Sequence, residues 1–144
     1  MLHALSARDT FRLRLPAHAS SVGIARRQVR STLGHWGLEA LGDDAGLVVT
    51  ELFTNAVLHS GSEHVACLLW TAGGLLHVEI VDEGRGDAGP LSRRAADADE
   101  NGRGLALVAH LAEGWGVKPP TRGTGRAVWA TLVCARGGAS RRTG

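Results

Sequence analysis

The most regular pattern in the chain is an apolar run that predicts a helix from about Asp43 to Ser60. Helical spacing places five apolar side chains on one buried face: Ala45, Val48, Val49, Leu52 and Ala56. Glu51, Asn55 and His59 recur every four residues, so they form a polar stripe on a neighbouring face. Polar groups beside a core are costly unless they have partners or a use. The stripe is therefore either a solvated edge of the helix or part of a functional site.

Alternating apolar and polar positions predict strands at 11–15, 64–71, 75–82 and 126–134, and Gly73 and Gly74 predict a hairpin between the middle two. Ser20 or Ser21 can cap a second helix that ends near Gly34. A third helix is predicted at 105–111, ending at Gly114. This order predicts an α/β two-layer sandwich with a mixed, mostly antiparallel sheet and three main helices on one face.

The strand at 75–82 has an informative phase. Leu76, Val78 and Ile80 share one face, whereas His77 and Glu79 occupy the other, which predicts a sheet with one solvent-facing side. Asp82 continues the apolar phase at the end of the strand. Two interpretations remain open: this carboxylate either caps a turn or accepts a hydrogen bond from a ligand at a pocket mouth.

Glycine-rich segments follow this strand and precede the last helix and the last strand. The polar stretch 87–101 is long for a loop in a compact domain, which indicates a functional or mobile segment. Gly102-Arg103-Gly104 leads directly into the third predicted helix, and free backbone N–H groups at a helix start favour an anion such as phosphate. Gly123-Thr124-Gly125 precedes the last strand.

Composition narrows the class of protein. With 144 residues and 44% hydrophobic content, the chain is long enough for one domain, predicted at 11–134 between a loose leader (1–10) and a disordered basic tail (135–144). Cys67 and Cys134 show no metal-ligand spacing and are expected to be reduced. The absence of a membrane span or secretory segment predicts a cytoplasmic protein. The net charge of +2, without a basic stripe interleaved with aromatics, argues against direct nucleic-acid binding.

Four motifs in order resemble the N, G1, G2 and G3 boxes of the GHKL (Bergerat-fold) ATPases. They are Glu51 and Asn55 on a helix, Asp82-x-Gly84-x-Gly86 after a strand, Gly102-x-Gly104-Leu105 at a helix, and Gly123-Thr124-Gly125 before a strand. The resemblance covers roughly residues 10 to 134. The small size and the run from Gly125 to Trp129 are similar to the anti-sigma-factor serine kinases of bacterial partner-switching systems.

The resemblance implies ATP and Mg²⁺ as cofactors and assigns roles by position. Asp82 would accept from the adenine amino group, Asn55 would hold the Mg²⁺, and Glu51 would be the general base. The other implied ATP-binding residues are Gly84, Gly86, Gly102, Arg103, Gly104, Leu105 and Thr124, with 87–101 as the ATP lid. His59 receives no assured role.

The implied function is that of an anti-sigma factor and protein serine kinase. Such a protein sequesters a sigma factor and phosphorylates an antagonist protein, commonly as a homodimer. Arg26, Arg27 and Arg30, on the predicted helix that begins near Ser20, are either a solvated surface or a partner contact. Glu51 argues for catalysis, but Glu100 departs from the family pattern, in which kinases have an arginine, and this leaves open the alternative of an ATP-dependent protein-binding switch without kinase activity. Arg103 and the lid residues Arg93 and Arg94 are candidate substitutes.

Overall fold

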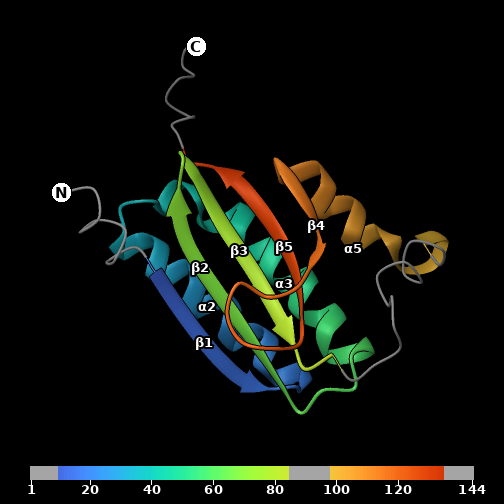
Figure 1. Cartoon of the computed structure of the whole chain (residues 1–144). Helices are drawn as coiled ribbons and strands as arrows, with labels where there is room; N and C mark the ends of the chain where they lie inside the picture. The colour runs from blue at the N-terminus through green and yellow to red at the C-terminus, as the bar shows by residue number, and fades with distance from the viewer. Residues whose placement is uncertain (1–9, 85–97, 135–144) are drawn as a thin grey trace.

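A computed structural model describes residues 10–84 and 98–134. In chain order these residues form β1 (Thr10–Pro16), α2 (Ala19–His35), the 3-10 helix η1 (Glu39–Leu41), α3 (Gly42–His59), β2 (His64–Ala72), β3 (Leu75–Asp82), α5 (Ala98–Leu111), β4 (Gly114–Lys118) and β5 (Arg126–Val133). Figure 1 shows these elements coloured along the chain.

The strands form one sheet in the order β1-β2-β3-β5-β4, and each neighbouring pair is antiparallel. The hairpin between β2 and β3 turns at Gly73 and Gly74, whose φ angles are 64° and 78°. Tight hairpin turns need positive φ at both central residues, which glycine adopts without steric cost. The predicted hairpin is thus confirmed, as is the two-layer α/β fold.

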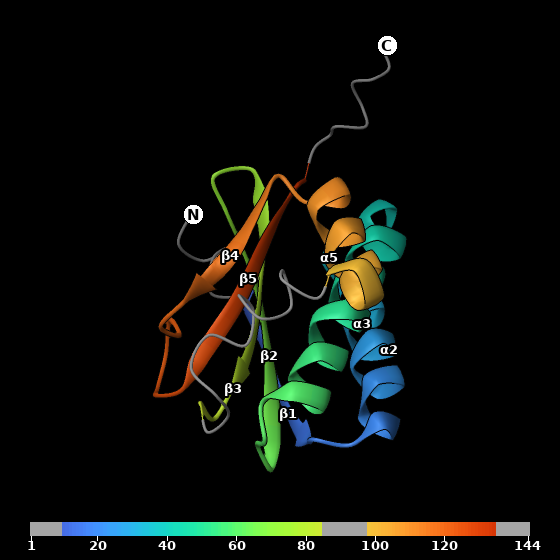
Figure 2. The same cartoon turned by 90° about the vertical axis from the view of Figure 1, so that its right-hand side faces the viewer.

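The helices cover one face of the sheet, and Figure 2 shows the two layers edge-on. The core lies between them and includes Leu33 of α2, Phe53 of α3, Leu69 of β2 and Ile80 of β3, all with at most 1% of their surface exposed. The opposite face carries no helix in the described part of the chain. We call it the open face; it bears Arg12 and Arg14 of β1, Ala66, Leu68 and Trp70 of β2, and His77, Glu79 and Val81 of β3.

Three details of the predicted elements are wrong. Gly114 begins β4, a strand that the sequence did not predict, instead of ending a helix. The helix α5 begins at Ala98, so Gly102 and Gly104 lie within it and not at its start. The residue before α2 is His18, which makes no side-chain cap, and Ser21 is buried inside the helix.

The two cysteines are both free, as predicted. Cys67 is fully buried in the core, and burial raises the pKa of its thiol to about 12. In the described ranges, no helix combines the length and apolar character needed to cross a membrane. The predicted leader and tail lie outside the described residues, apart from Thr10, which starts β1.

Candidate functional site

Asp82 ends β3 on the helix-facing side of the sheet, as its apolar phase predicts, and only 5% of its surface is exposed. Its Oδ1 accepts a hydrogen bond from the backbone N–H of Gly84 at 2.6 Å. Arg126, its partner across the β3–β5 ladder, places Nη2 3.3 Å from Oδ1 and Nε 3.4 Å from Oδ2. Asp82 therefore caps the turn after β3, and the cap fixes the orientation of its carboxylate.

The predicted G1 and G3 segments lie against one another through their glycines. A Cβ added to Gly84, which has a φ of 72°, would lie 3.4 Å from the Cα of Gly125. A Cβ added to Gly125, with a φ of 111°, would lie 2.1 Å from the carbonyl oxygen of Asp82, a distance that real Cβ atoms do not reach. Glycine is required at position 125 because backbone approaches backbone there. The close approach fixes where Thr124 sits relative to Asp82.

The end of α3 is tied to the end of β3 by a chain of hydroxyl groups. The Ser60 hydroxyl donates to the carbonyl of Ala56 at 2.7 Å, and its oxygen lies 2.9 Å from that of Ser62. The backbone N–H of Glu83 donates to Ser62 Oγ at 2.8 Å, and a Glu83 side-chain oxygen accepts from the N–H of Glu63 at 2.9 Å. The last turn of α3 is thereby held beside Asp82 and Gly84.

Glu51 and Asn55 lie one helical turn apart on α3, and both are half-buried. Gly46 marks the side of α3 that meets α2, because a Cβ there would lie 3.3 Å from Arg26. Glu51 follows Gly46 by five residues, a rotation of roughly 140° about the helix axis. Glu51 and Asn55 therefore face away from α2, whereas His59, the third member of the stripe, is exposed.

Glu79 corrects the prediction of a uniformly solvent-facing side, because it lies on the open face yet is 0% exposed. The connection between β4 and β5 passes over it, as Figure 1 shows in front of β3. Lys118 Nζ lies 2.5 Å from its Oε2, the Thr121 hydroxyl donates to the same oxygen, and the Thr121 N–H donates to Oε1 at 3.2 Å. We call these three residues the Glu79 clamp.

The clamp sets the ionisation of Glu79. Burial by itself would raise the pKa of this carboxyl, but hydrogen bonds from Lys118 and Thr121, together with the Lys118 charge, outweigh that effect and lower it. Glu79 is thus held as a carboxylate. It fixes the first residues of the connection that ends in Gly123-Thr124-Gly125.

The predicted G2 segment and lid are described only in part. Leu105 lies on α5 with 7% exposure and belongs to the core, where it packs with the apolar face of the helix. Gly102, Arg103 and Gly104 lie within α5, so the argument from free N–H groups at a helix start is wrong. Gly86, Arg93, Arg94 and most of the predicted lid, 87–97, lie outside the described residues.

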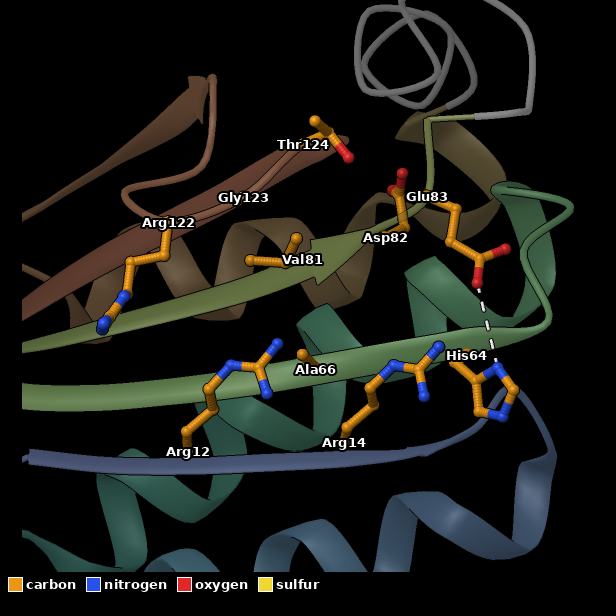
Figure 3. Close-up of a pocket in the computed structure, with 10 residues that line it drawn as sticks. All are labelled: Arg12, Arg14, His64, Ala66, Val81, Asp82, Glu83, Arg122, Gly123 and Thr124. Atoms are coloured by element: carbon orange, nitrogen blue, oxygen red, sulfur yellow. Dashed lines mark ion pairs between the residues drawn. The ribbon is translucent and has the colours of Figure 1, made fainter.

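A cavity of about 420 Å³ reaches Asp82 and Thr124 from the open face, as Figure 3 shows. Its other walls come from β1, from β2, from β3 and the residue after it, and from the β4–β5 connection: Arg12, Arg14, His64, Ala66, Val81, Glu83, Arg122 and Gly123. The stripe on α3 lies on the other, helix-facing side of the sheet, and Asp82 and Thr124 border the cavity at the edge nearest that side. The cavity is taken up separately below.

The helix-facing residues fit a purine nucleotide with Mg²⁺ in chemical type. Asp82 offers a fixed carboxylate acceptor, and backbone without side chains passes beside it at Gly84 and Gly125. Asn55 offers an amide oxygen of the kind that suits Mg²⁺, which takes its remaining ligands from phosphates and water. Among the described residues, no group of three or more His, Cys, Asp or Glu side chains is placed to hold a metal ion.

Several residues that build this site were not predicted from the sequence. Arg126 pairs with Asp82, Ser60 and Ser62 tie α3 to β3, and the Glu79 clamp holds the last glycine-rich segment. The register of β3 against β5 would have indicated Arg126, because it stands opposite Asp82. No sequence signal pointed to the clamp, whose members come from positions 79, 118 and 121.

Comparison with known families agrees with this geometry. The chain matches the model of the histidine kinase-like ATPase domain over residues 15–132, which is most of its length and spans all of the described strands and helices except the first residues of β1 and the last of β5. No curated protein matches the chain. The chain belongs to the family of histidine kinase-like ATPase domains, of GHKL type, and is an ATP-binding domain.

Proposed function

We propose that the chain is a protein serine kinase that also acts as an anti-sigma factor in the cytoplasm. The observation that carries the proposal is the position of Glu51, one helical turn before Asn55 and on the same half-buried side of α3. A carboxylate beside a metal-binding amide suits a general base, which nucleotide binding alone does not require. The family resemblance supports the same assignment.

In this proposal each residue has one task. When bound, ATP would supply the phosphoryl group, and a Mg²⁺ held at Asn55 would offset the charge of its phosphates. Glu51 accepts the proton of the attacking serine hydroxyl, and Asn55 holds the metal. Asp82 orients the base of the nucleotide through its amino group. The chemistry therefore depends on positioning by α3 and by the end of β3.

The partners in the proposal are a sigma factor and an antagonist protein that carries the acceptor serine. A hollow of about 580 Å³ between α2 and α3 is a candidate contact surface. Its lining includes Arg26 and Arg27, which are exposed, and Leu47, which is 43% exposed. Arg30 lines it too and pairs with Asp43 at 2.6 Å. A homodimer formed through the same helices is part of the proposal.

Glu100 favours a second candidate function. It occupies the position where kinases of the resembled group carry an arginine, and it lies in the first turn of α5. A negative residue in place of a positive one removes a group that would stabilise charge on the transferred phosphoryl. The second candidate is therefore an ATP-dependent switch that holds a partner without phosphorylating it.

Label transfer from γ-labelled ATP separates the two candidates. The chain is incubated with Mg²⁺ and with each small protein encoded beside its gene, and the label on those proteins is counted. The kinase predicts transfer that Glu51→Ala abolishes and that Glu39→Ala, an exposed control on η1, leaves unchanged. ATP binding without transfer to any tested protein would favour the switch, and transfer that survives Glu51→Ala would remove Glu51 from catalysis.

A further inference from the structure

Three arginines converge on the open face around the cavity that Figure 3 shows. Arg12 and Arg14 extend from β1 over the sheet, and Arg122 extends toward them from the β4–β5 connection. All three are exposed, and within the described residues none of them makes an ion pair. Their like charges repel each other, and an anion bound between them would offset this repulsion.

The acidic side chains of the cavity do not neutralise these arginines. Asp82 is paired with Arg126 at 3.3 Å, which leaves Glu83, whose carboxylate lies 3.8 Å from His64, as one negative charge against three guanidinium groups. Further along the open face, the Glu79 carboxylate is committed to Lys118. The cavity therefore keeps an excess of positive charge.

A smaller, more apolar cavity of about 230 Å³ adjoins the first and shares Arg12 and Arg122 with it. Leu68 and Trp70 line it, and the Trp70 ring is stacked on His77 with centroids 5.0 Å apart. Because they share two arginines, the two cavities lie side by side on the open face, and we call them together the open-face groove. Its larger part is the more basic, and its smaller part adds the apolar side chains of Leu68 and Trp70. A ligand that fits it has acidic groups next to an apolar group.

The spacing of the arginines suits an extended peptide. Arg12 and Arg14 are two residues apart on a strand, so their side chains leave the backbone about 7 Å apart. Carboxylates at alternate positions of an extended peptide have the same spacing, and guanidinium groups pair well with carboxylates. β1 is an edge strand, so in the described sheet no further strand lies beside Arg12 and Arg14.

We infer that this open-face groove binds an acidic, extended segment of a partner protein, with its carboxylates on Arg12, Arg14 and Arg122 and an apolar residue beside Trp70. A second copy of the chain is disfavoured because the same basic face would meet itself. Nucleic acid is disfavoured because three arginines are few for a ligand that is bound through many phosphates. The inference does not depend on nucleotide chemistry on the helix-facing side.

The test uses the full chain without nucleotide and a fluorescein-labelled peptide of alternating Glu and Thr that ends in Leu-Leu. Its counterpart has Gln in place of Glu, and single-stranded oligothymidylate is the nucleic-acid probe. The double substitution Arg12→Gln/Arg14→Gln is compared with Arg141→Gln/Arg142→Gln near the end of the chain, which makes the same change in net charge. The NMR signal of the backbone amide of Ala66, which lines the groove, reports by its change in chemical shift whether the peptide binds there.

Binding of the Glu peptide is expected to weaken by about 10-fold or more in the β1 double variant and by less than about 2-fold in the Arg141→Gln/Arg142→Gln variant. The Gln peptide is expected to bind weakly to every form, and the Ala66 amide signal is expected to shift only with the Glu peptide. Equal losses in both double variants, equal binding of the two peptides, or tighter binding of oligothymidylate would each overturn the inference. So would self-association of the chain that the β1 substitutions abolish.

Discussion

The substitution Glu79→Gln tests the clamp that holds the β4–β5 connection on the sheet. It removes the negative charge of a side chain that is 0% exposed while keeping its size. Lys118 loses its ion-pair partner, and the Thr121 hydroxyl and N–H lose a charged acceptor. Gln can still accept one hydrogen bond, so part of the clamp survives.

The size of the effect follows from the surroundings of each group. Breaking a buried ion pair by removing one partner costs about 3–5 kcal/mol when the remaining charge stays buried. Lys118 is 36% exposed and regains water, so the expected loss of unfolding free energy is about 2–3 kcal/mol. For a domain of this length that loss lowers the melting temperature by about 4–12 °C.

Urea unfolding followed by tryptophan fluorescence measures the loss at pH 7. The matched control is Glu113→Gln, which removes an exposed carboxylate next to β4 and is expected to change stability by less than about 0.5 kcal/mol. Because the pKa of Glu79 is lowered on folding, its contribution is present above the unfolded glutamate pKa and is lost as the pH falls. The gap between wild type and Glu79→Gln therefore narrows below about pH 4.3. Equal stability of the two Gln variants at pH 7 would refute the clamp.

Three further predictions concern single positions. Gly125→Ala places a Cβ against the Asp82 carbonyl and is expected to cost at least about 3 kcal/mol in urea unfolding, whereas Gly123→Ala, with open space around it and a φ of 77°, costs about 1–2 kcal/mol; equal costs would contradict the close approach. Asn55→Ala is expected to remove Mg²⁺-dependent nucleotide binding in calorimetry without changing the free energy of unfolding by more than about 1 kcal/mol. Nucleotide binding by wild type that does not depend on Mg²⁺ would exclude the metal-binding role of Asn55. Cys67, with its thiol pKa raised to about 12, is expected to resist iodoacetamide at pH 8 until urea unfolds the chain, as mass spectrometry would show.

Local patterns predicted the elements that depend on local rules. The apolar spacing of α3 and the alternation of β3 follow directly from which side chains must reach one core. Asp82 was identified for the same reason, because a carboxylate in phase with buried residues needs a partner or a ligand. The hairpin at Gly73 and Gly74 was predictable from glycine alone.

The errors arose where distant segments decide the outcome. The strand β4 was not predicted because Gly114 was taken as the end of a helix. Gly116 faces the indole of Trp129, and a Cβ there would lie only 3.1 Å from the ring nitrogen. Glu79 appeared solvent-facing because no local pattern shows that residues 118–121 return to cover it. The start of α5 was placed too late because glycines were given the weight of a helix boundary, although a helix tolerates them at about 1 kcal/mol each.

The central claim is that Asp82 recognises the adenine of ATP through its amino group. Calorimetric titration with ATP and with inosine triphosphate, which has a carbonyl oxygen in place of that amino group, tests it most directly. Wild type is expected to prefer ATP by roughly 10- to 150-fold, the value of a hydrogen bond to a charged group. In Asp82→Asn, checked by urea unfolding because Asp82 also pairs with Arg126, the preference is expected to vanish or reverse, since the new amide can donate to the inosine carbonyl. Equal affinity of wild type for both nucleotides, or an unchanged preference in Asp82→Asn, would contradict the account.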